Sequence, residues 1–326
     1  MGASRQPEYR LLSDRVQVHV HHAQAARIAA ILREIAPRPA PWVIVPLDDE
    51  AALHAAMPEM RVLFAPMPPR AGWTRATQLQ LVQLAGAGVD HFLPSPDLPP
   101  GVVVANARGV FADEAADHAM MMVLALTRRL PRLLQQQRAR RWEMLPMPKL
   151  AGRTLLVLGL GEIGRRVASR AAAFGMRVLG VRRSGVATPC VDEVHPAVDA
   201  ALVARADAVV VALPRTSETD RVVPVDALRP EAVLVDISRG GRVDADAVAA
   251  RLRAGTLAGA ALDVFEDEPL AGDSPLWDTP NLFITPHIAG YGERYLERAA
   301  LCFAENLARL ERGDPLTGVV DRNAGY

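Results

Sequence analysis

Short runs of β-branched and aliphatic residues alternate with longer helical patterns along most of the 326-residue chain. The alternation begins with WVIV at 42–45 and RVLFA at 61–65. A pattern of this kind is typical of parallel sheets whose strands are connected by crossover helices. It therefore predicts an α/β protein.

A denser series of apolar runs follows in the second half of the chain. Its members are separated by helical stretches or polar turns, and they are TLLVLGLG, RVLGV, ADAVVVALP, AVLVDIS, GAALDVF and LFITPH. Strand candidates that alternate with helices in this order predict a doubly wound parallel sheet.

Two helical stretches flank this series. The stretch at 113–134 starts with acidic residues and carries basic residues toward its end, as the helix dipole favours. Its middle is apolar on nearly every face, so we expect it to be buried between layers or domains. The amphipathic stretch at 294–313 is expected to end at Gly313. It lies outside the strand series, which suggests that the chain returns to its first domain.

The length of the chain indicates two domains, at about 150 residues for each. We predict a dinucleotide-binding domain at 108–288. The other domain, discontinuous in sequence, would combine 1–107 with 289–326 and would bind the substrate.

Composition narrows the choice of partners and compartment. Lys plus Arg and Asp plus Glu each number 37, so no net basic field attracts nucleic acid. The N-terminal MGASRQPEYR lacks the apolar core of a secretory signal, and the apolar run at 119–126 is too short to span a membrane. Cys190 and Cys302 form no metal-ligand pattern and suggest a reducing compartment. We expect a cytoplasmic protein that does not bind membranes.

A histidine cluster near the N-terminus offers potential metal ligands. His19 and His21 would lie on one face of a strand, beside His22. No acid or thiol pattern accompanies them, so we predict no metal site.

A glycine-rich turn carries the strongest binding signal. Gly159, Gly161 and Gly164 have G-x-G-x-x-G spacing between a strand and a helix whose first residues are Glu162 and Ile163. The glycines would permit a tight turn, close approach of a pyrophosphate and close helix packing, and the helix N-terminus offers N–H groups to the phosphates. A purely structural turn has the same composition, but the strand–turn–helix context favours a dinucleotide site.

The end of the next strand bears on the choice of cofactor. NAD sites usually have a carboxylate there, about 20 residues after the glycines, whereas this chain has Arg182 and Arg183. A guanidinium can form paired hydrogen bonds with a 2′-phosphate, although both residues could also be solvated surface arginines. We therefore predict that NADP(H) is preferred and that NAD(H) is possible.

Three later segments would end at the same carboxyl edge of the sheet, where α/β proteins bind ligands. They carry Arg239, Asp263 with Glu268, and His287. Singly, these could be a solvated charge, an acidic turn and a structural histidine. Their order downstream of the glycine turn favours a site that acts on a carboxylate.

The motifs LGLGEIG, LPRTSET, ISRGGRVD, AGAALDVFEDEPL and TPHIAGY, in this order, closely resemble those of the D-isomer-specific 2-hydroxyacid dehydrogenases. The resemblance extends from about residue 85 to the end of the chain. It implies two Rossmann-like lobes with doubly wound parallel sheets, of which the discontinuous substrate lobe is flavodoxin-like.

The resemblance also implies roles for individual residues. Arg239 would bind the carboxylate of a 2-keto acid, and His287 would be the general acid that protonates the carbonyl oxygen. Glu268 would be the carboxylate partner that favours the protonated imidazole. Other implied positions are Asp263 near the nicotinamide carboxamide, Pro214 beside the adenosine, and the backbone N–H groups of Ala87 and Gly88 at the substrate carboxylate.

Within the family, the paired arginines resemble the NADPH-using glyoxylate/hydroxypyruvate reductases, so reduction of a small 2-keto acid is the leading hypothesis. One alternative is a dehydrogenase of a phosphorylated hydroxy acid, of 3-phosphoglycerate or erythronate-4-phosphate type. Another is a cofactor-gated binding protein related to transcriptional corepressors, since fold alone does not determine function. The resemblance also implies a homodimer.

Overall fold

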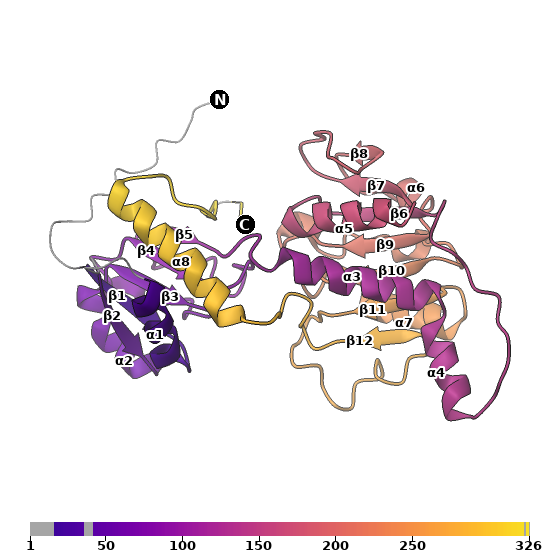
Figure 1. Cartoon of the computed structure of the whole chain (residues 1–326), viewed down its shortest axis with the longest axis horizontal. Helices are drawn as coiled ribbons and strands as arrows, with labels where there is room; N and C mark the ends of the chain where they lie inside the picture. Colours follow the sequence, from indigo (N-terminus) through magenta and orange to yellow (C-terminus); the bar gives the residue numbers. More distant parts are fainter. Residues whose placement is uncertain (1–15, 36–41, 323, 326) are drawn as a thin grey trace. The chain divides into compact units, whose positions relative to one another are not determined.

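The computed structural model describes residues 16–35, 42–322 and 324–325. The N-terminal MGASRQPEYR, on which the absence of a secretory signal was judged, lies outside these residues. The chain divides into two compact units (Figure 1), unit 1 at 1–111 with 292–326 and unit 2 at 112–291. The sequence predicted divisions after 107 and after 288, whereas the units divide after 111 and after 291.

Unit 1 contains a parallel sheet. In the described part of the chain its strand order is β2-β1-β3-β4-β5, which is the flavodoxin-like order. The strands are β1 (Val16–His21), β2 (Trp42–Leu47), β3 (Val62–Ala65), β4 (Leu81–Leu84) and β5 (Val103–Ala105). The helices are α1 (Ala25–Ile35), α2 (Glu50–Ala56) and α8 (Tyr295–Arg312), with short 3-10 turns η1 (Met57–Glu59) and η2 (Trp73–Arg75).

Strands β3 and β4 of unit 1 are buried on both faces. Along β3, Val62 and Phe64 join the apolar cluster that includes α1 and α8, whereas Leu63 faces the cluster on the other side of the sheet. The ring of Phe64 lies 5.0 Å from that of Phe303, so α8 packs directly on the sheet. The helix ends at Gly313, whose φ of +70° confirms the predicted C-terminal cap.

Unit 2 contains the larger sheet, which is parallel throughout. Within the described residues its strand order is β12-β11-β10-β9-β6-β7-β8, a doubly wound order that reverses at β6. The strands are β6 (Thr154–Leu158), β7 (Arg177–Val181), β8 (Glu193–His195), β9 (Ala208–Val211), β10 (Val233–Asp236), β11 (Gly259–Leu262) and β12 (Leu282–Ile284). All the predicted strands of the dense series are present, and the predicted α/β fold is confirmed. The short, partly buried edge strand β8 was not predicted.

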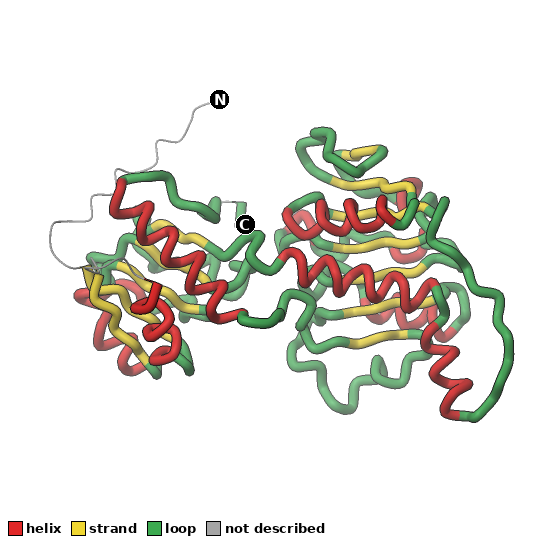
Figure 2. The backbone as a smooth tube through the Cα atoms, in the orientation of Figure 1, coloured by secondary structure: helices red, strands yellow, loops and turns green. Residues whose placement is uncertain are grey.

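Helices cover both faces of this sheet. Leu155 and Val157 of β6 join the cluster with α3 and α5, which run side by side in Figures 1 and 2. Leu156 and Leu158 join the cluster on the opposite face. The helices are α3 (Ala112–Thr127), α4 (Leu130–Arg138), α5 (Glu162–Ala173), α6 (Ala200–Val203) and α7 (Ala245–Arg253), with 3-10 turns η3 (Ser217–Thr219) and η4 (Val225–Ala227).

The single helical stretch expected at 113–134 is wrong, because the structure divides it into α3 and α4. Arg129 between them has a φ of +55°, and Pro131 lies in the first turn of α4, where its missing N–H costs no hydrogen bond. Much of α3 is buried as expected, but Met121 is half exposed. No helix among the described residues has both the length and the apolar character needed to cross a bilayer.

Candidate active site and cofactor loop

The predicted site residues of unit 2 follow the carboxyl ends of its parallel strands. Gly159 follows β6, and Arg182 follows β7. Arg239, Asp263 and His287 follow β10, β11 and β12, which are neighbours in the sheet. The segments that bear the candidate catalytic residues therefore leave the sheet side by side.

His287 and Glu268 form a direct pair. Nδ1 of His287 lies 2.7 Å from Oε2 of Glu268, and the other oxygen of Glu268 accepts a hydrogen bond from the backbone N–H of Phe265 at 2.9 Å. Both carboxylate oxygens thus have partners that fix the orientation of the group. With Nδ1 turned toward Glu268, Nε2 is the ring nitrogen that can exchange a proton with a substrate.

The backbone of His287 is held in the left-handed region, with a φ of +54°. Asp263 stabilises this conformation. Its carbonyl accepts the His287 N–H at 2.8 Å, and its carboxylate accepts hydrogen bonds from the Thr285 hydroxyl and from the N–H groups of Ile288 and Ala289. Asp263 is almost fully buried, so these bonds are sheltered from water. Its described contacts fasten the segment that carries His287.

A partly buried histidine also faces this segment. Nε2 of His118, on α3, lies 3.2 Å from Oγ1 of Thr285 and 4.0 Å from Oδ1 of Asp263. Burial lowers the pKa of His118 below its usual value, and the Asp263 carboxylate partly opposes that shift. The sequence did not single out His118, because it lies within an apolar helix pattern.

Arg239 begins a tight turn, Arg239–Gly240–Gly241–Arg242, that packs against the Glu268 segment. A side chain at Gly240 would begin 1.8 Å from the carbonyl oxygen of Phe265, so only glycine fits there. Arg239 is partly buried, and its Nη1 donates to the carbonyl of Ser238 at 2.6 Å. Arg239 therefore places a guanidinium, a group suited to pairing with carboxylates, just after β10.

Two buried charged residues in this region were missed by the sequence reasoning. Asp236 accepts hydrogen bonds from the Ser238 N–H and hydroxyl, yet its burial raises the pKa of the carboxyl group to about 7. Arg242 is 1% exposed and pairs with Asp220 at 2.7 Å. Both belong to the quoted motifs around Arg239, but charged residues after a strand are usually exposed, so their burial left no signal in the sequence.

The glycine turn fits a dinucleotide. Gly159 has a φ of +98°, and a side chain at Gly164 would begin 1.9 Å from the Gly159 carbonyl oxygen, so both must be glycine to form the turn. By contrast, a side chain at Gly161 would meet nothing within 4 Å. This space lies at the N-terminus of α5, where Gly161 is the N-cap and provides no side-chain acceptor. It can accommodate a pyrophosphate against free backbone N–H groups.

Other predicted cofactor residues surround this turn. Arg182 is partly buried at the end of β7, and its backbone N–H donates to the backbone carbonyl of His195 at 2.9 Å. Nη1 of the exposed Arg183 lies 3.7 Å from Oε2 of Glu218, on the segment that follows β9. Pro214 begins that segment, and its carbonyl accepts the Thr219 hydroxyl at 2.7 Å. Glu162 forms ion pairs with Arg165 and Arg166, and Ile163, in the first turn of α5, packs against the apolar core of unit 2.

The remaining predicted residues, Ala87 and Gly88, lie in unit 1 after β4. Ala87 is exposed and Gly88 is partly buried. Nδ2 of Asn106 donates to the Ala87 carbonyl at 2.7 Å, which anchors the loop.

Comparison with known proteins places this arrangement in a family. The model of the D-isomer specific 2-hydroxyacid dehydrogenase NAD-binding domain matches residues 120–289. The chain is 35% identical to the glyoxylate reductase of Korarchaeum cryptofilum over 251 residues, which cover 73% of this chain and 75% of that protein. The chain belongs to the D-isomer specific 2-hydroxyacid dehydrogenase family. Members of this family are NAD(P)-dependent oxidoreductases of 2-hydroxyacids, so the chain is an enzyme of this class.

Solved structures agree over nearly the whole chain. A family member from Xanthobacter autotrophicus Py2, in complex with NADPH and MES, superposes with a TM-score of 0.85 at 30% identity and covers 95% of this chain and 99% of its own. An NADPH-dependent glyoxylate/hydroxypyruvate reductase from Sinorhizobium meliloti, in complex with NADP and sulfate, superposes with a TM-score of 0.82 at 28% identity. The match covers 96% of this chain and 100% of the reductase. The predicted family and two-lobe fold are confirmed.

The chain also matches longer enzymes of this family. It is 31% identical to the D-3-phosphoglycerate dehydrogenase of Archaeoglobus fulgidus over 76% of its own length, and it spans about half of that protein, 48%.

Proposed function

We propose that this dehydrogenase reduces a small 2-keto acid of the glyoxylate or hydroxypyruvate type, with NADPH as the preferred cofactor. The observation that carries the proposal is the His287–Glu268 pair, with Nδ1 and Oε2 2.7 Å apart, beside the Arg239 turn. Support also comes from the glyoxylate reductase and the NADPH-dependent reductase among the similar proteins.

Bound NADPH would supply the hydride that reduces the keto carbon. In this proposal Arg239 binds the substrate carboxylate. The backbone N–H groups of Ala87 and Gly88 remain predicted substrate-binding groups of unit 1. His287 donates the Nε2 proton to the carbonyl oxygen, so that the product is the 2-hydroxy acid. Glu268, with Oε2 2.7 Å from Nδ1 of His287, holds the imidazole ring in place for this transfer. In the proposed cofactor site, Gly159, Gly161 and Gly164 would form the phosphate turn, with Glu162 and Ile163 at the helix start. Arg182 and Arg183 would hold the 2′-phosphate, and Pro214 and Asp263 would lie near the adenosine and the nicotinamide.

Replacement of His287 tests this assignment. We choose His287→Asn, because asparagine tolerates the left-handed backbone that His287 adopts. The variant should lose about 10²–10⁴-fold in kcat with glyoxylate or hydroxypyruvate, the usual contribution of a positioned general acid. It should still bind NADPH, as measured by the fluorescence of the bound nicotinamide.

A matched control is available on β8. Nε2 of His195 lies 3.3 Å from Oε2 of Glu193, which makes a second His–Glu pair that takes no part in the proposed proton transfer. His195→Asn should keep the wild-type turnover. Full activity of His287→Asn would contradict the proposal, and so would an equal loss in both variants. A cofactor-gated binding protein would instead keep its biological activity in His287→Asn.

A phosphorylated hydroxy acid is the second candidate substrate. It is supported by the match to D-3-phosphoglycerate dehydrogenases, among them the enzyme of Archaeoglobus fulgidus. Reduction of 3-phosphohydroxypyruvate at a higher kcat/KM than hydroxypyruvate would favour this candidate over the first.

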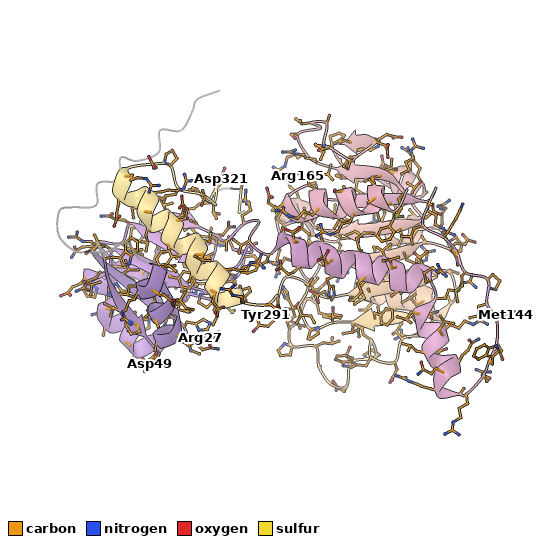
Figure 3. The ribbon with its side chains drawn as sticks, viewed as in Figure 1. Arg27, Asp49, Met144, Arg165, Tyr291 and Asp321 are labelled. Atoms are coloured by element: carbon orange, nitrogen blue, oxygen red, sulfur yellow. The ribbon has the colours of Figure 1, made fainter. Side chains whose placement is uncertain are left out.

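We also propose that the enzyme is a homodimer formed through unit 2. Four apolar side chains on α4 and the segment after it are exposed, namely Leu130, Leu134, Trp142 and Met144. Trp142 is 99% and Met144 95% exposed, and Figure 3 shows Met144 projecting from the segment after α4. Exposed apolar groups of this size gather where another protein surface covers them, and a second copy of the chain is our proposed partner.

A further inference from the structure

Arg242 is an enclosed charge that the proposed reaction does not use. It is 1% exposed, whereas its ion-pair partner Asp220 is 66% exposed. Burial lowers the pKa of the guanidinium below its usual value, and its Nε has no hydrogen-bond partner. Burying a charge with incomplete pairing costs free energy, so the arginine is a poor choice for stability alone.

The guanidinium of Arg242 joins two segments of unit 2. Nη1 donates to the carbonyl oxygen of Thr216 at 3.1 Å and to Oγ1 of Thr219 at 2.9 Å. The Thr219 hydroxyl in turn donates to the carbonyl of Pro214 at 2.7 Å. Arg242 therefore holds the Pro214 end of the segment through Thr219, and it holds the Asp220 end directly through the ion pair.

The same residue closes the turn that begins at Arg239. The N–H of Arg242 donates to the Arg239 carbonyl at 3.4 Å, and Nη2 reaches the Gly240 carbonyl at 3.5 Å. Gly240 in turn lies against the Phe265 carbonyl, with no room for a side chain. A shift of the Pro214–Asp220 segment would consequently be transmitted to the turn that presents Arg239.

We propose that Arg242 is a positioning residue that couples cofactor binding beside the Pro214–Asp220 segment to binding of the substrate carboxylate by Arg239. The inference rests on the proposed function, in which these two segments contact cofactor and substrate. Cofactor bound beside the Pro214–Asp220 segment stabilises the hydrogen bonds that this segment forms with Arg242. These hydrogen bonds in turn order the turn that begins at Arg239. Because coupling is reciprocal, substrate must tighten cofactor binding by the same factor.

The test measures the affinity of oxamate, an unreactive carboxylate shaped like a small 2-keto acid, with and without saturating NADPH. The ratio of the two dissociation constants is the coupling factor, which typically lies at about 5–150-fold in coupled systems. In Arg242→Met, which keeps most of the unbranched stem of the side chain but removes the guanidinium and its charge, the factor should fall by about fivefold or more. Thr219→Val removes only the hydroxyl that reaches Pro214 and should reduce the factor in the same direction, even if Arg242→Met does not fold.

Arg221→Met is the matched control. Arg221 also forms ion pairs between these loops, with Asp244 at 3.1 Å and Glu266 at 3.3 Å, but these side-chain contacts do not involve Thr216 or Thr219. The control should keep the wild-type coupling factor. If Arg242 has a purely structural role, its replacement would weaken the binding of both oxamate and NADPH and leave the coupling factor unchanged. That result would overturn the inference. Failure of the wild type to bind oxamate or to reduce any 2-keto acid would instead overturn the proposed function.

Discussion

At the scale of single residues, His287 combines an uncommon backbone conformation with its proposed proton transfer. A φ of +54° is unfavourable for most residues. The hydrogen bonds that the buried Asp263 accepts from this segment keep its backbone in that conformation. Glu268 then sets the ring orientation. The proposed proton donor and the carboxylate that orients it are thus arranged before any substrate binds, which would reduce the reorganisation needed during the proposed reaction.

Arg182 is the residue on which the choice of cofactor is proposed to depend. Arg182→Asp would replace a cation that attracts the 2′-phosphate with an anion that repels it. We expect kcat/KM with NADPH, relative to NADH, to fall by about 10–100-fold, since a hydrogen bond to a charged group contributes ~1.5–3 kcal/mol. Arg183→Asp should have a smaller effect because Arg183 is exposed and already near Glu218. An equal loss with both cofactors would contradict the assignment.

At the scale of elements, the turn between β6 and α5 separates two requirements for glycine. Gly164→Ala places a methyl group against the Gly159 carbonyl and should destabilise the protein by ~1–3 kcal/mol, visible as a lower Tm. Gly161→Ala meets no neighbour, although alanine is a poorer N-cap than glycine, so its Tm should fall less than that of Gly164→Ala while its Kd for NADPH rises. Unchanged NADPH affinity in Gly161→Ala would show that no pyrophosphate approaches this position.

The buried Asp236 at the end of β10 should make the stability of the protein depend on pH. The pKa of Asp236 is raised to about 7, above the value of about 3.9 expected in the unfolded chain. The folded state therefore binds the proton more tightly, and stability is lost as the pH rises from about 4 through 7.

Asp236→Asn removes this titration and retains an acceptor for Ser238. We expect the free energy of unfolding of Asp236→Asn, measured by urea denaturation, to change relative to the wild type in a pH-dependent way. The change should be roughly 2–3 kcal/mol more stabilising at pH 8 than at pH 5. Asp226→Asn, at an exposed position in η4, should show no such difference. A gain for Asp236→Asn that is equal at both pH values would mean that the carboxyl group is ionised in the folded protein throughout this range.

The elements also show what the sequence could predict. Apolar runs bounded by glycine or polar turns identified the six strands from β6 to β12 other than β8, which has only three partly buried residues. Arg129 and Pro131 interrupt the helix between α3 and α4, but the apolar periodicity continues past them and hid the break. At the site, the motifs led to His287, Glu268 and Arg239. The burial of Asp236 and Arg242 arises from packing between segments distant in sequence, so local patterns could not predict it.

At the scale of the whole molecule, the proposed homodimer has a direct test. Light scattering should give a mass of twice 35.1 kDa for the wild type. Trp142→Ser combined with Met144→Ser removes the two most exposed apolar groups and should shift the mass toward 35.1 kDa. A monomeric wild type, or a dimer that both substitutions leave intact, would contradict the proposed interface.

The central claim concerns the reaction of the whole enzyme, and steady-state rates of NADPH and NADH oxidation test it most directly. The assay would use glyoxylate, hydroxypyruvate, 3-phosphohydroxypyruvate and larger 2-keto acids with the wild-type protein. The proposal predicts a higher kcat/KM with NADPH than with NADH, and the highest values for glyoxylate or hydroxypyruvate. Inactivity with every 2-keto acid, or a clear preference for NADH, would contradict it.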